Sequence, residues 1–374
     1  MSQQSGPSSG AATYEAAGVS IDAGDKAVEL MKVWVDKARR PETLGGIGGF
    51  AGLFDAGAIK AMHQPLLATS ADGVGTKVAI AQAMDVHNTI GFDLVGMLVD
   101  DLVVCGAEPL FVTDYIATGR VVPERIAAIV QGIAEACVQA GCALVGGETA
   151  EHPGLLGPDE YDVAGSTTGV VEAADLLGPG RVVPGDVVVA MGSSGLHSNG
   201  YSLVRHVLLD RDSGAGLPLD RHIAELGRTL GEELLEPTRI YAKACLDLVR
   251  TLGPGTVHAM SHVTGGGLAA NLERVLPETV VVTVDRGTWT PQPVFDLVRR
   301  AGSMEITELE RTLNCGVGML AVVTAEEAER AVVLLAGHGI DAWVCGRVSR
   351  HDPAGAGDPP APGSVTLTGT HPGW

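Results

Sequence analysis

The segment Thr69–Lys77, TSADGVGTK, constrains the fold of this chain more than any other. It follows the apolar run Pro65–Ala68, which is typical of the end of a buried strand. Glycines in such a turn let the backbone approach a ligand and direct N–H groups toward it. Asp72 is a hard-cation ligand by type, and Lys77 carries a charge suited to phosphate. The spacing is not that of the P-loop, so the segment indicates another kind of phosphate turn, or only a turn.

The same arrangement of an apolar strand and a glycine-rich turn recurs along the chain. Ala143–Val145 precedes residues 146–154, Asp186–Met191 precedes residues 192–200, and Val257–His262 precedes residues 263–267. The last two turns lead into predicted helices, whose free N–H groups and dipoles favour anions. Strands that follow one another are mixed with helices in each half. The pattern therefore predicts an α+β protein of two lobes whose glycine turns converge on a cleft.

Composition divides the chain into four parts. Residues 1–13 are rich in Ser and Gly, which predicts a disordered head. A variable region, Glu172–Val183, places the boundary between an N-terminal domain of residues 14–176 and a C-terminal domain of residues 177–350. Residues 351–374 begin with a Pro/Gly-rich stretch and are predicted to be a tail without evident chemistry.

Two features near the N-terminus suit a mobile arm. The pattern predicts a helix Lys26–Arg39 capped by Asp25. Lys32 lies beside its apolar stripe and is either a solvated lysine or a phosphate contact. The segment Gly45–Gly52 is too rich in glycine for a stable helix or strand. It is predicted to be a flexible loop, able to fold over a ligand.

Three acids interrupt the apolar, helix-like segment Ile90–Cys105. Asp93 and Asp100 share one helical face, whereas Asp101 is turned away from it. Burying an unpaired carboxylate is costly, so these acids must be paired, capped, exposed or metal-bound. A solvent-facing strip or a salt bridge is the ordinary explanation. Two consecutive acids in such a segment favour at least one facing a cation.

Charge and composition exclude several classes of function. The 374-residue chain has a formal net charge of −20, which argues against non-specific binding of nucleic acid. Aromatic residues make up only 4% of the chain, so base-stacking platforms are not expected. No apolar run approaches the roughly 20 residues that span a bilayer, and no signal peptide is evident. The six cysteines contain no CxxC pair and predict reduced thiols in a cytoplasmic protein, with a reactive Cys315 as the alternative.

Eight blocks of the sequence, in one order, resemble the phosphoribosylformylglycinamidine cyclo-ligase family, also called the aminoimidazole ribonucleotide synthetases. The blocks are ADGVGTK (71–77), NTIGFDLVGMLVDDLVVCGAEPLFVTDYIATG (88–119), GGETAEHPG (146–154), DVAG (162–165), GSSGLHSNGYSLVR (192–205), LEPTRIY (235–241), HVTGGG (262–267) and RTLNCGVGM (311–319). The resemblance extends from about Tyr14 to Val348. Related enzymes, such as selenophosphate synthetase and thiamine-monophosphate kinase, share the DGVGTK-like block far more than the later blocks.

The resemblance implies a homodimer whose N-terminal lobes pair their strands into a shared barrel, with a C-terminal α/β lobe on each side. It also implies that ATP and Mg²⁺ are used to convert formylglycinamidine ribonucleotide to aminoimidazole ribonucleotide in purine biosynthesis, with release of ADP and phosphate. Transfer of the γ-phosphoryl group to the amide oxygen would make that oxygen a leaving group, and the substrate's own nitrogen would then close the ring. Such transfer depends on positioning and charge neutralisation.

The resemblance also assigns residues of this chain to roles. The magnesium ligands would be Asp72, Asp101 and Glu148. ATP would contact Lys32, Asp72, Gly73, Val74, Gly75, Thr76 and Lys77. The substrate's ribose phosphate or the transferring phosphoryl group would contact His197, Ser198, Asn199, Thr264, Gly265 and Gly266. Lys77 would neutralise phosphate oxygens, and His197 is a candidate for proton transfer.

The sequence departs from the family pattern at four positions. These are Ser70 where the family has Thr, Asp100 in place of Asn, Glu310 in place of Tyr, and Leu313 in place of Phe. Asp100 is expected to add a charge close to the metal, and Glu310 to alter substrate contacts.

Two other interpretations of the chain remain open. One is a small-molecule kinase of the same fold, which would share the DGVGTK block. The other is a non-catalytic nucleotide-binding subunit. Retention of the acids and of Lys77 argues against the second.

Overall fold

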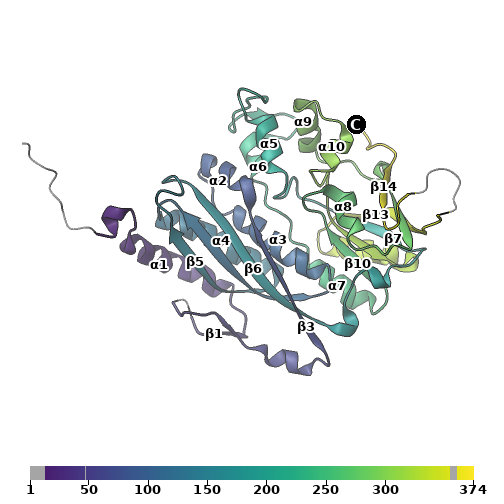
Figure 1. The fold of residues 1–374 in the computed structure, drawn as a ribbon, viewed down its shortest axis with the longest axis horizontal. Coiled ribbons are helices and arrows are strands. Elements are labelled where there is room, and N and C mark those ends of the chain that lie inside the picture. The colour runs from purple at the N-terminus through teal and green to yellow at the C-terminus, as the bar shows by residue number, and fades with distance from the viewer. Residues whose placement is uncertain (1–12, 47, 354–359) are drawn as a thin grey trace, which may run out of the picture.

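The computed structural model describes residues 13–46, 48–353 and 360–374. Apart from Thr13, the predicted disordered head lies outside the described residues. The described chain forms two lobes, each built on its own mixed sheet with helices packed against it (Figure 1). The two-lobed α+β architecture expected from the sequence is therefore confirmed.

The N-terminal lobe contains four long strands: β3 (Pro65–Gly73), β4 (Glu108–Thr118), β5 (Ala143–Glu151) and β6 (Tyr161–Glu172). Their order in the sheet is β3–β6–β4–β5. Strand β6 is antiparallel to both of its neighbours, whereas β4 and β5 are parallel. A parallel pair needs a crossover connection, and helix α4 (Pro123–Ala140) provides it.

Three helices form the layer behind this sheet: α1 (Ile21–Lys37), α3 (Ile90–Val103) and α4 (Figure 1). Helix α1 begins earlier than predicted, because the hydroxyl of Ser20, rather than Asp25, caps it by accepting from the N–H of Ala23 at 3.3 Å. Helices α3 and α4 approach closely where glycines face each other. A Cβ on Gly91 would collide with the main chain of α4, and one on Gly132 would collide with the carbonyl oxygen of Asn88.

The opposite face of the sheet leaves apolar side chains open to solvent. Side chains alternate along β3, with the even-numbered ones packed toward α3. Leu67 is 69% exposed and Tyr115 on β4 is 41% exposed. An exposed apolar sheet face of this kind marks a surface for association.

The C-terminal lobe contains a six-stranded sheet in the order β10–β12–β7–β13–β11–β14. The strands are β7 (Val187–Gly192), β10 (Val257–His262), β11 (Val280–Asp285), β12 (Val317–Val323), β13 (Ala342–Arg350) and β14 (Val365–Thr368). All pairs are antiparallel except β11 and β14. Strands β7 and β12 are buried along nearly their whole length, which explains their continuous apolar sequences.

The remaining elements are shorter. Helices of the C-terminal lobe are α5 (Tyr201–Leu208), α6 (Leu230–Leu234), α7 (Ala242–Leu252), α8 (Gly267–Glu273), α9 (Pro293–Ala301), α10 (Ile306–Glu310) and α11 (Ala328–Gly337). Helix α2 (Val78–Met84) follows the DGVGTK turn, and two small hairpins comprise β1 (Thr43–Leu44), β2 (Leu53–Phe54), β8 (His222–Ile223) and β9 (Arg228–Thr229).

The C-terminal residues are not the peripheral tail predicted from composition. Strand β14 extends the sheet by pairing with β11. His371 is 1% exposed, and its ring lies between Trp289 and Trp374, with centroids 4.6 and 5.0 Å away. The prediction failed because the Pro/Gly-rich composition of residues 351–363 carries no information about the strand that comes after them.

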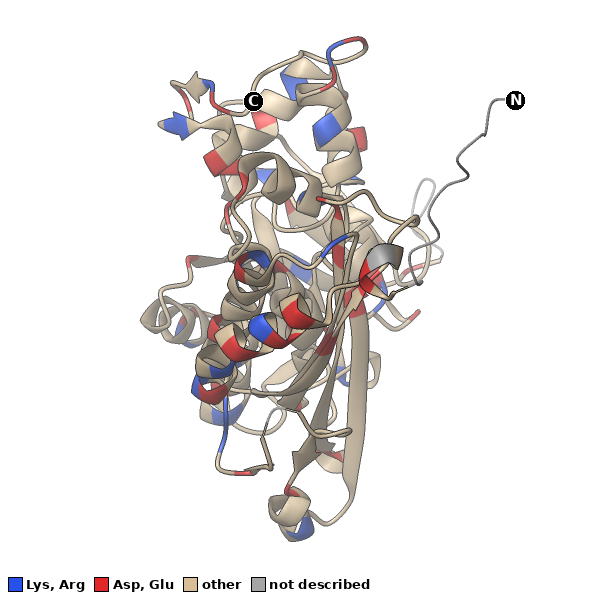
Figure 2. Ribbon diagram, turned by 90° about the vertical axis from the view of Figure 1, so that its left-hand side faces the viewer, with Lys and Arg blue, Asp and Glu red and all other residues tan. Residues whose placement is uncertain are grey.

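Surface charge is spread over both lobes. Figure 2 shows acidic residues along helices and loops of each lobe, with Lys and Arg interspersed among them. Within the described part of the chain, no helix combines the length and the hydropathy needed to cross a bilayer.

Candidate functional site

Lys77 lies at the centre of the contact between the two lobes. Its side chain is fully buried, and Nζ donates to Oδ1 of Asp93 at 2.7 Å. The same ammonium donates to the carbonyl oxygens of His197 at 3.0 Å and of Glu236 at 2.6 Å. Asp93 Oδ1 also accepts from the N–H and the hydroxyl of Thr238, at 3.0 and 2.6 Å. One ion pair thus joins α3 to two loops of the other lobe.

Lys77 forms its contacts within the protein. All three protons of its ammonium are used there, and none of the side chain reaches solvent. Burial lowers the pKa of Lys77 and raises the pKa of Asp93, and the attraction between the two groups opposes both shifts. The side chain thus joins the two lobes, and its predicted contact with phosphate stays a prediction.

The acids further along α3 also turn toward the C-terminal lobe. Asp100 is buried and accepts from the N–H of Tyr241 at 3.0 Å. Burial raises its pKa to about 7, so this carboxyl is partly protonated near neutrality. Asp101 is 41% exposed, and its Oδ1 lies 2.9 Å from Nδ1 of His262. Asp100 is thus a buried, partly ionised group, whereas Asp101 keeps an accessible carboxylate. The expected effect of Asp100 on a metal stays a prediction.

Glycine-rich loops from both lobes meet beside this contact. The hydroxyl of Ser198 donates to the carbonyl oxygen of Val74 at 2.7 Å. The hydroxyls of Thr76 and Ser202 lie 3.2 Å apart. The DGVGTK turn and the GSSGLHSNG segment, both of which the sequence singled out, are thus neighbours in the fold. The predicted convergence of these two turns is confirmed.

The third glycine turn is ordered by its own helix. The side chain of Asn271 in α8 donates to the carbonyl oxygens of Thr264, Gly265 and Gly267 at 3.3, 3.2 and 2.8 Å. Gly265 and Gly266 are exposed. Their main chain is therefore held in place while remaining open to solvent.

Asn314, which sequence reasoning did not single out, organises the GSSGLHSNG loop. Its Nδ2 donates to the carbonyl oxygens of Gly195 and Leu196 at 3.0 and 3.1 Å. Its Oδ1 accepts from the hydroxyl of Ser193 at 3.1 Å and from the N–H of Gly316 at 2.9 Å. A buried asparagine with all its bonds satisfied fixes the backbone around it. The RTLNCGVGM block was the only signal that pointed to this region.

His197 is held in an unusual backbone conformation and away from water. Its φ is 62°, its side chain is 2% exposed, and Nε2 accepts from the N–H of Ser194 at 3.2 Å. Nδ1 is buried without a partner among the described residues. Burial lowers the pKa of His197 well below its usual value, with His262 and Lys77 adding repulsion. The ring is therefore neutral at neutral pH, and its predicted part in proton transfer stays a prediction.

The buried histidine makes a prediction about pH. The unfolded chain takes up a proton at His197 as the pH falls below about 6.5, whereas the folded chain does not, so its burial destabilises the folded state progressively at acid pH. Asparagine tolerates this backbone region and does not titrate. His197→Asn should reduce the loss of unfolding free energy between pH 6.5 and 5.5 by about 1 kcal/mol. Urea melts of both proteins at the two pH values measure this, and parallel losses would contradict the buried, neutral histidine.

The predicted three-carboxylate magnesium site is not formed. Among the residues that the structure describes, no group of three or more His, Cys, Asp or Glu side chains is placed to hold a metal ion. Asp72 at the end of β3 accepts from the N–H of Gly73 at 2.7 Å, and Asp101 pairs with His262. Glu148 lies instead at a cavity of the N-terminal lobe. Magnesium often takes only one or two protein carboxylates and completes its shell with water and substrate phosphates.

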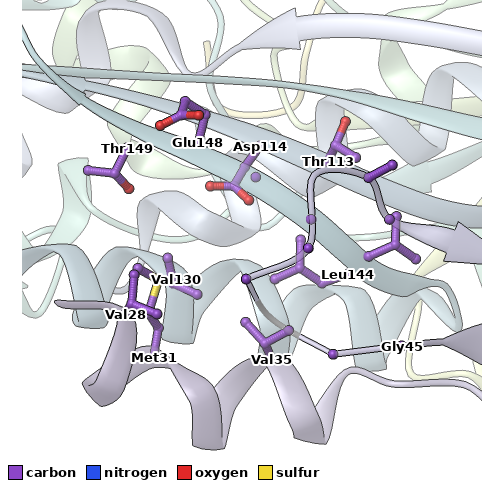
Figure 3. A pocket seen from close by; sticks show the side chains of 18 of the residues that line it. Val28, Met31, Val35, Gly45, Thr113, Asp114, Val130, Leu144, Glu148 and Thr149 are labelled. Carbon is purple, nitrogen blue, oxygen red and sulfur yellow. The ribbon is translucent and has the colours of Figure 1, made fainter. Parts of the chain in front are cut away.

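That cavity, called the N-lobe cavity below, has a volume of about 730 Å³ and lies between α1, α4, β4, β5 and the residues 45, 46 and 48–53 (Figure 3). Residue 47 of the predicted Gly45–Gly52 loop lies outside the described residues. Val28, Met31 and Val35 line one wall, and Asp114 and Glu148 are among the few charged groups. Lys32, which was predicted to contact ATP, is exposed on α1 and is not part of this lining.

Both lobes match known domain families. Residues 54–171 match the N-terminal domain of AIR synthase related proteins, and residues 183–355 match the C-terminal domain of the same proteins. The chain is 48% identical over 338 residues to a protein of Syntrophotalea carbinolica named phosphoribosylformylglycinamidine cyclo-ligase, covering 90% of this chain and 95% of the relative.

Solved structures share the fold at low identity. Thiamine-monophosphate kinase from Stenotrophomonas maltophilia K279a superposes with a TM-score of 0.64 at 20% identity, covering 92% of this chain and 96% of that chain. The hydrogenase maturation protein HypE in complex with ATP gives a TM-score of 0.59 at 19% identity, covering 89% of this chain and 88% of that chain.

Proposed function

The chain belongs to the phosphoribosylformylglycinamidine cyclo-ligase family, whose members close an imidazole ring with ATP in purine biosynthesis, and on this premise we propose how its residues share the work. The observation that carries the assignment is an identity of nearly half over 90% of the chain. ATP transfers its γ-phosphoryl group to the amide oxygen of formylglycinamidine ribonucleotide. A nitrogen of the substrate then attacks the carbon that carries the phosphorylated oxygen. The C–N bond closes the imidazole ring, the C–O bond breaks, and the oxygen leaves as part of phosphate. We propose that the reaction takes place in the cytoplasm.

The N-lobe cavity is proposed to receive the nucleotide. Its mainly apolar walls and few polar groups are typical of a pocket for a small molecule, and its size suits one. The residues 45, 46 and 48–53 lie over it, and all of them except Phe50 and Leu53 are glycine or alanine. HypE, which shares the fold, was solved with ATP, and that supports nucleotide binding on this scaffold.

The loops between the lobes are proposed to receive the substrate's phosphate and the transferring phosphoryl group. Gly265 and Gly266 present exposed main chain for anions. His197 contributes the unpartnered Nδ1, which serves as a hydrogen-bonding group in the neutral ring. Ser198, Asn199 and Thr264 line the same junction, where Ser198 is engaged with Val74.

Magnesium is proposed to enter with the nucleotide as part of MgATP. Asp72 and Asp101 are the acids retained for this role, because Asp101 is partly exposed beside the lobe junction and Asp72 begins the DGVGTK turn. Glu148 faces the N-lobe cavity and is the third candidate. The protein then supplies individual carboxylates, and the phosphates supply the remaining charge.

An assay tests the proposal directly. Purified protein with formylglycinamidine ribonucleotide, ATP and MgCl₂ should form aminoimidazole ribonucleotide and ADP in equal amounts. ADP formed without ring closure would favour a kinase-like reaction. Nucleotide binding without any turnover would favour a non-catalytic subunit.

The exposed sheet face of the N-terminal lobe is proposed to pair with a second copy, as the shared barrel of the family requires. Leu67→Lys places a charge on this face and should convert a dimer to a monomer, as measured by sedimentation. Val333→Lys is the matched control, because Val333 is also 69% exposed but lies on α11 of the other lobe. A monomeric wild-type protein, or a dimer unaffected by Leu67→Lys, would contradict this pairing.

A further inference from the structure

Asp114 is a partly buried carboxyl group in the wall of the N-lobe cavity. It lies on β4 at the middle of that wall (Figure 3). Among the described residues, its side chain accepts a hydrogen bond only from its own main-chain N–H. A carboxyl group among apolar side chains gains free energy from a hydrogen-bonding partner. An occupant of the cavity can supply that partner.

The sheet is built to make room for this carboxyl. In the strand register, Asp114 stands between Gly165 on β6 and Gly147 on β5. A Cβ on Gly147 would collide with the Asp114 carboxylate. Glycine at position 147 thus leaves space for the side chain to lean across β5. The residue opposite Asp114 on β5 is therefore matched to the position of the Asp114 side chain.

The surroundings of Asp114 suit a flat, apolar group more than a phosphate. Val28 and Met31 of α1, Val130 of α4 and Leu144 of β5 line the cavity around it (Figure 3). Phosphates carry negative charge and avoid both apolar walls and an unpaired acid. Burial also raises the pKa of Asp114 to about 7, so the group is partly a neutral carboxylic acid. A neutral carboxylic acid can donate one hydrogen bond and accept another.

We propose that Asp114 is the residue that recognises the base of the nucleotide, by pairing with the ring nitrogen and the amino group on the edge of adenine. This inference rests on the proposed binding of ATP in the N-lobe cavity. Adenine offers an acceptor at N1 beside a donor at its 6-amino group, which is the complement of a carboxylic acid. Guanine offers a carbonyl oxygen and an N–H in these places, and a neutral carboxylic acid can pair with that edge as well. The informative comparison is therefore with a purine that lacks the 6-amino group.

The test compares nucleotides that differ only on this edge. Dissociation constants for ATP and for purine riboside triphosphate, which lacks the 6-amino group, are measured calorimetrically with MgCl₂ on the full chain. The wild-type protein should bind ATP about tenfold or more tightly than this 6-deamino analogue. Asp114→Leu should abolish that preference, mainly by lowering the affinity for ATP. Asp114→Asn should retain it, because an amide also donates and accepts. Asp212→Asn, an exposed acid of the other lobe, is the control and should change nothing.

Each outcome decides the matter. Equal affinity of the wild-type protein for ATP and the 6-deamino analogue overturns the inference, even if Asp114→Leu fails to fold. A preference that survives in folded Asp114→Leu also overturns it, as does the absence of nucleotide binding. The two results on base preference leave the proposed ring-closing activity intact, whereas an absence of nucleotide binding counts against both. Formation of aminoimidazole ribonucleotide tests that activity separately.

Discussion

Replacing Lys77 with methionine should lower the free energy of unfolding by about 3–5 kcal/mol, because it leaves the buried carboxylate of Asp93 without its counter-ion. The carbonyl oxygens of His197 and Glu236 lose their donor as well. Loss of the contacts that Lys77 makes between the lobes should also loosen the lobe junction. Turnover should then be abolished even at temperatures where the variant remains folded. Chemical denaturation and steady-state kinetics measure the two effects.

The control uses the same substitution in an exposed pair. Nζ of Lys26 lies 2.6 Å from Oε1 of Glu124, and both side chains are more than half exposed. Lys26→Met should change stability little, since exposed ion pairs are screened by water. If Lys77→Met cost no more than Lys26→Met and kept full activity, Lys77 would not hold the lobes together.

Replacing Asp101 with asparagine should reduce kcat by about 100-fold or more and raise the magnesium concentration needed for half-maximal rate. The accessible carboxylate beside His262 is the acid of α3 best placed to meet a cation carried by the nucleotide. Stability should change far less than turnover, because the side chain is partly exposed. Initial rates over a magnesium titration, together with urea melts, separate these effects.

The neighbouring acid is the matched control. Asp100→Asn removes a buried carboxyl that bonds to the N–H of Tyr241 and should leave kcat within a few-fold of wild type. Because the pKa of Asp100 is raised from 3.8 to about 7, the folded chain holds a proton that the unfolded chain has lost, so wild-type stability falls as the pH rises between these values. The variant should therefore gain stability relative to wild type over this range and keep that gain, without further change, above about pH 7. Equal losses of kcat in both variants would show that position 101 has no special place near the metal.

The structure also explains one departure from the family pattern. Glu310 forms two hydrogen bonds with the guanidinium of Arg286, at 2.6 and 2.7 Å, and lies 3.4 Å from Nε2 of His371. Arg286 holds the pKa of Glu310 below its usual value against the effect of burial. The acid therefore anchors the C-terminal residues to α10, just before the segment that carries Asn314. Glu310 thus makes its contacts within the protein, and its expected effect on substrate contacts stays a prediction.

Local patterns in the sequence were sufficient for much of the fold. Apolar runs that end at glycine turns predicted β7 and β10, and the helix-like segment Ile90–Cys105 contains α3, because side-chain spacing is a local property. The glycine turns indicated loops that meet one another in the fold. The blocks shared with relatives predicted the family and the reaction.

Only the tertiary structure decided which charged residues are available for chemistry. Lys77 and Asp93 are distant from Thr238 in sequence, yet the three side chains meet in one buried contact between the lobes. The sequence gives no sign that Asp114 differs from other strand residues, because Gly147 lies opposite it only in the folded sheet. The cost of burying a charge depends on neighbours from other segments, and a linear sequence states the residue types without stating which of them meet.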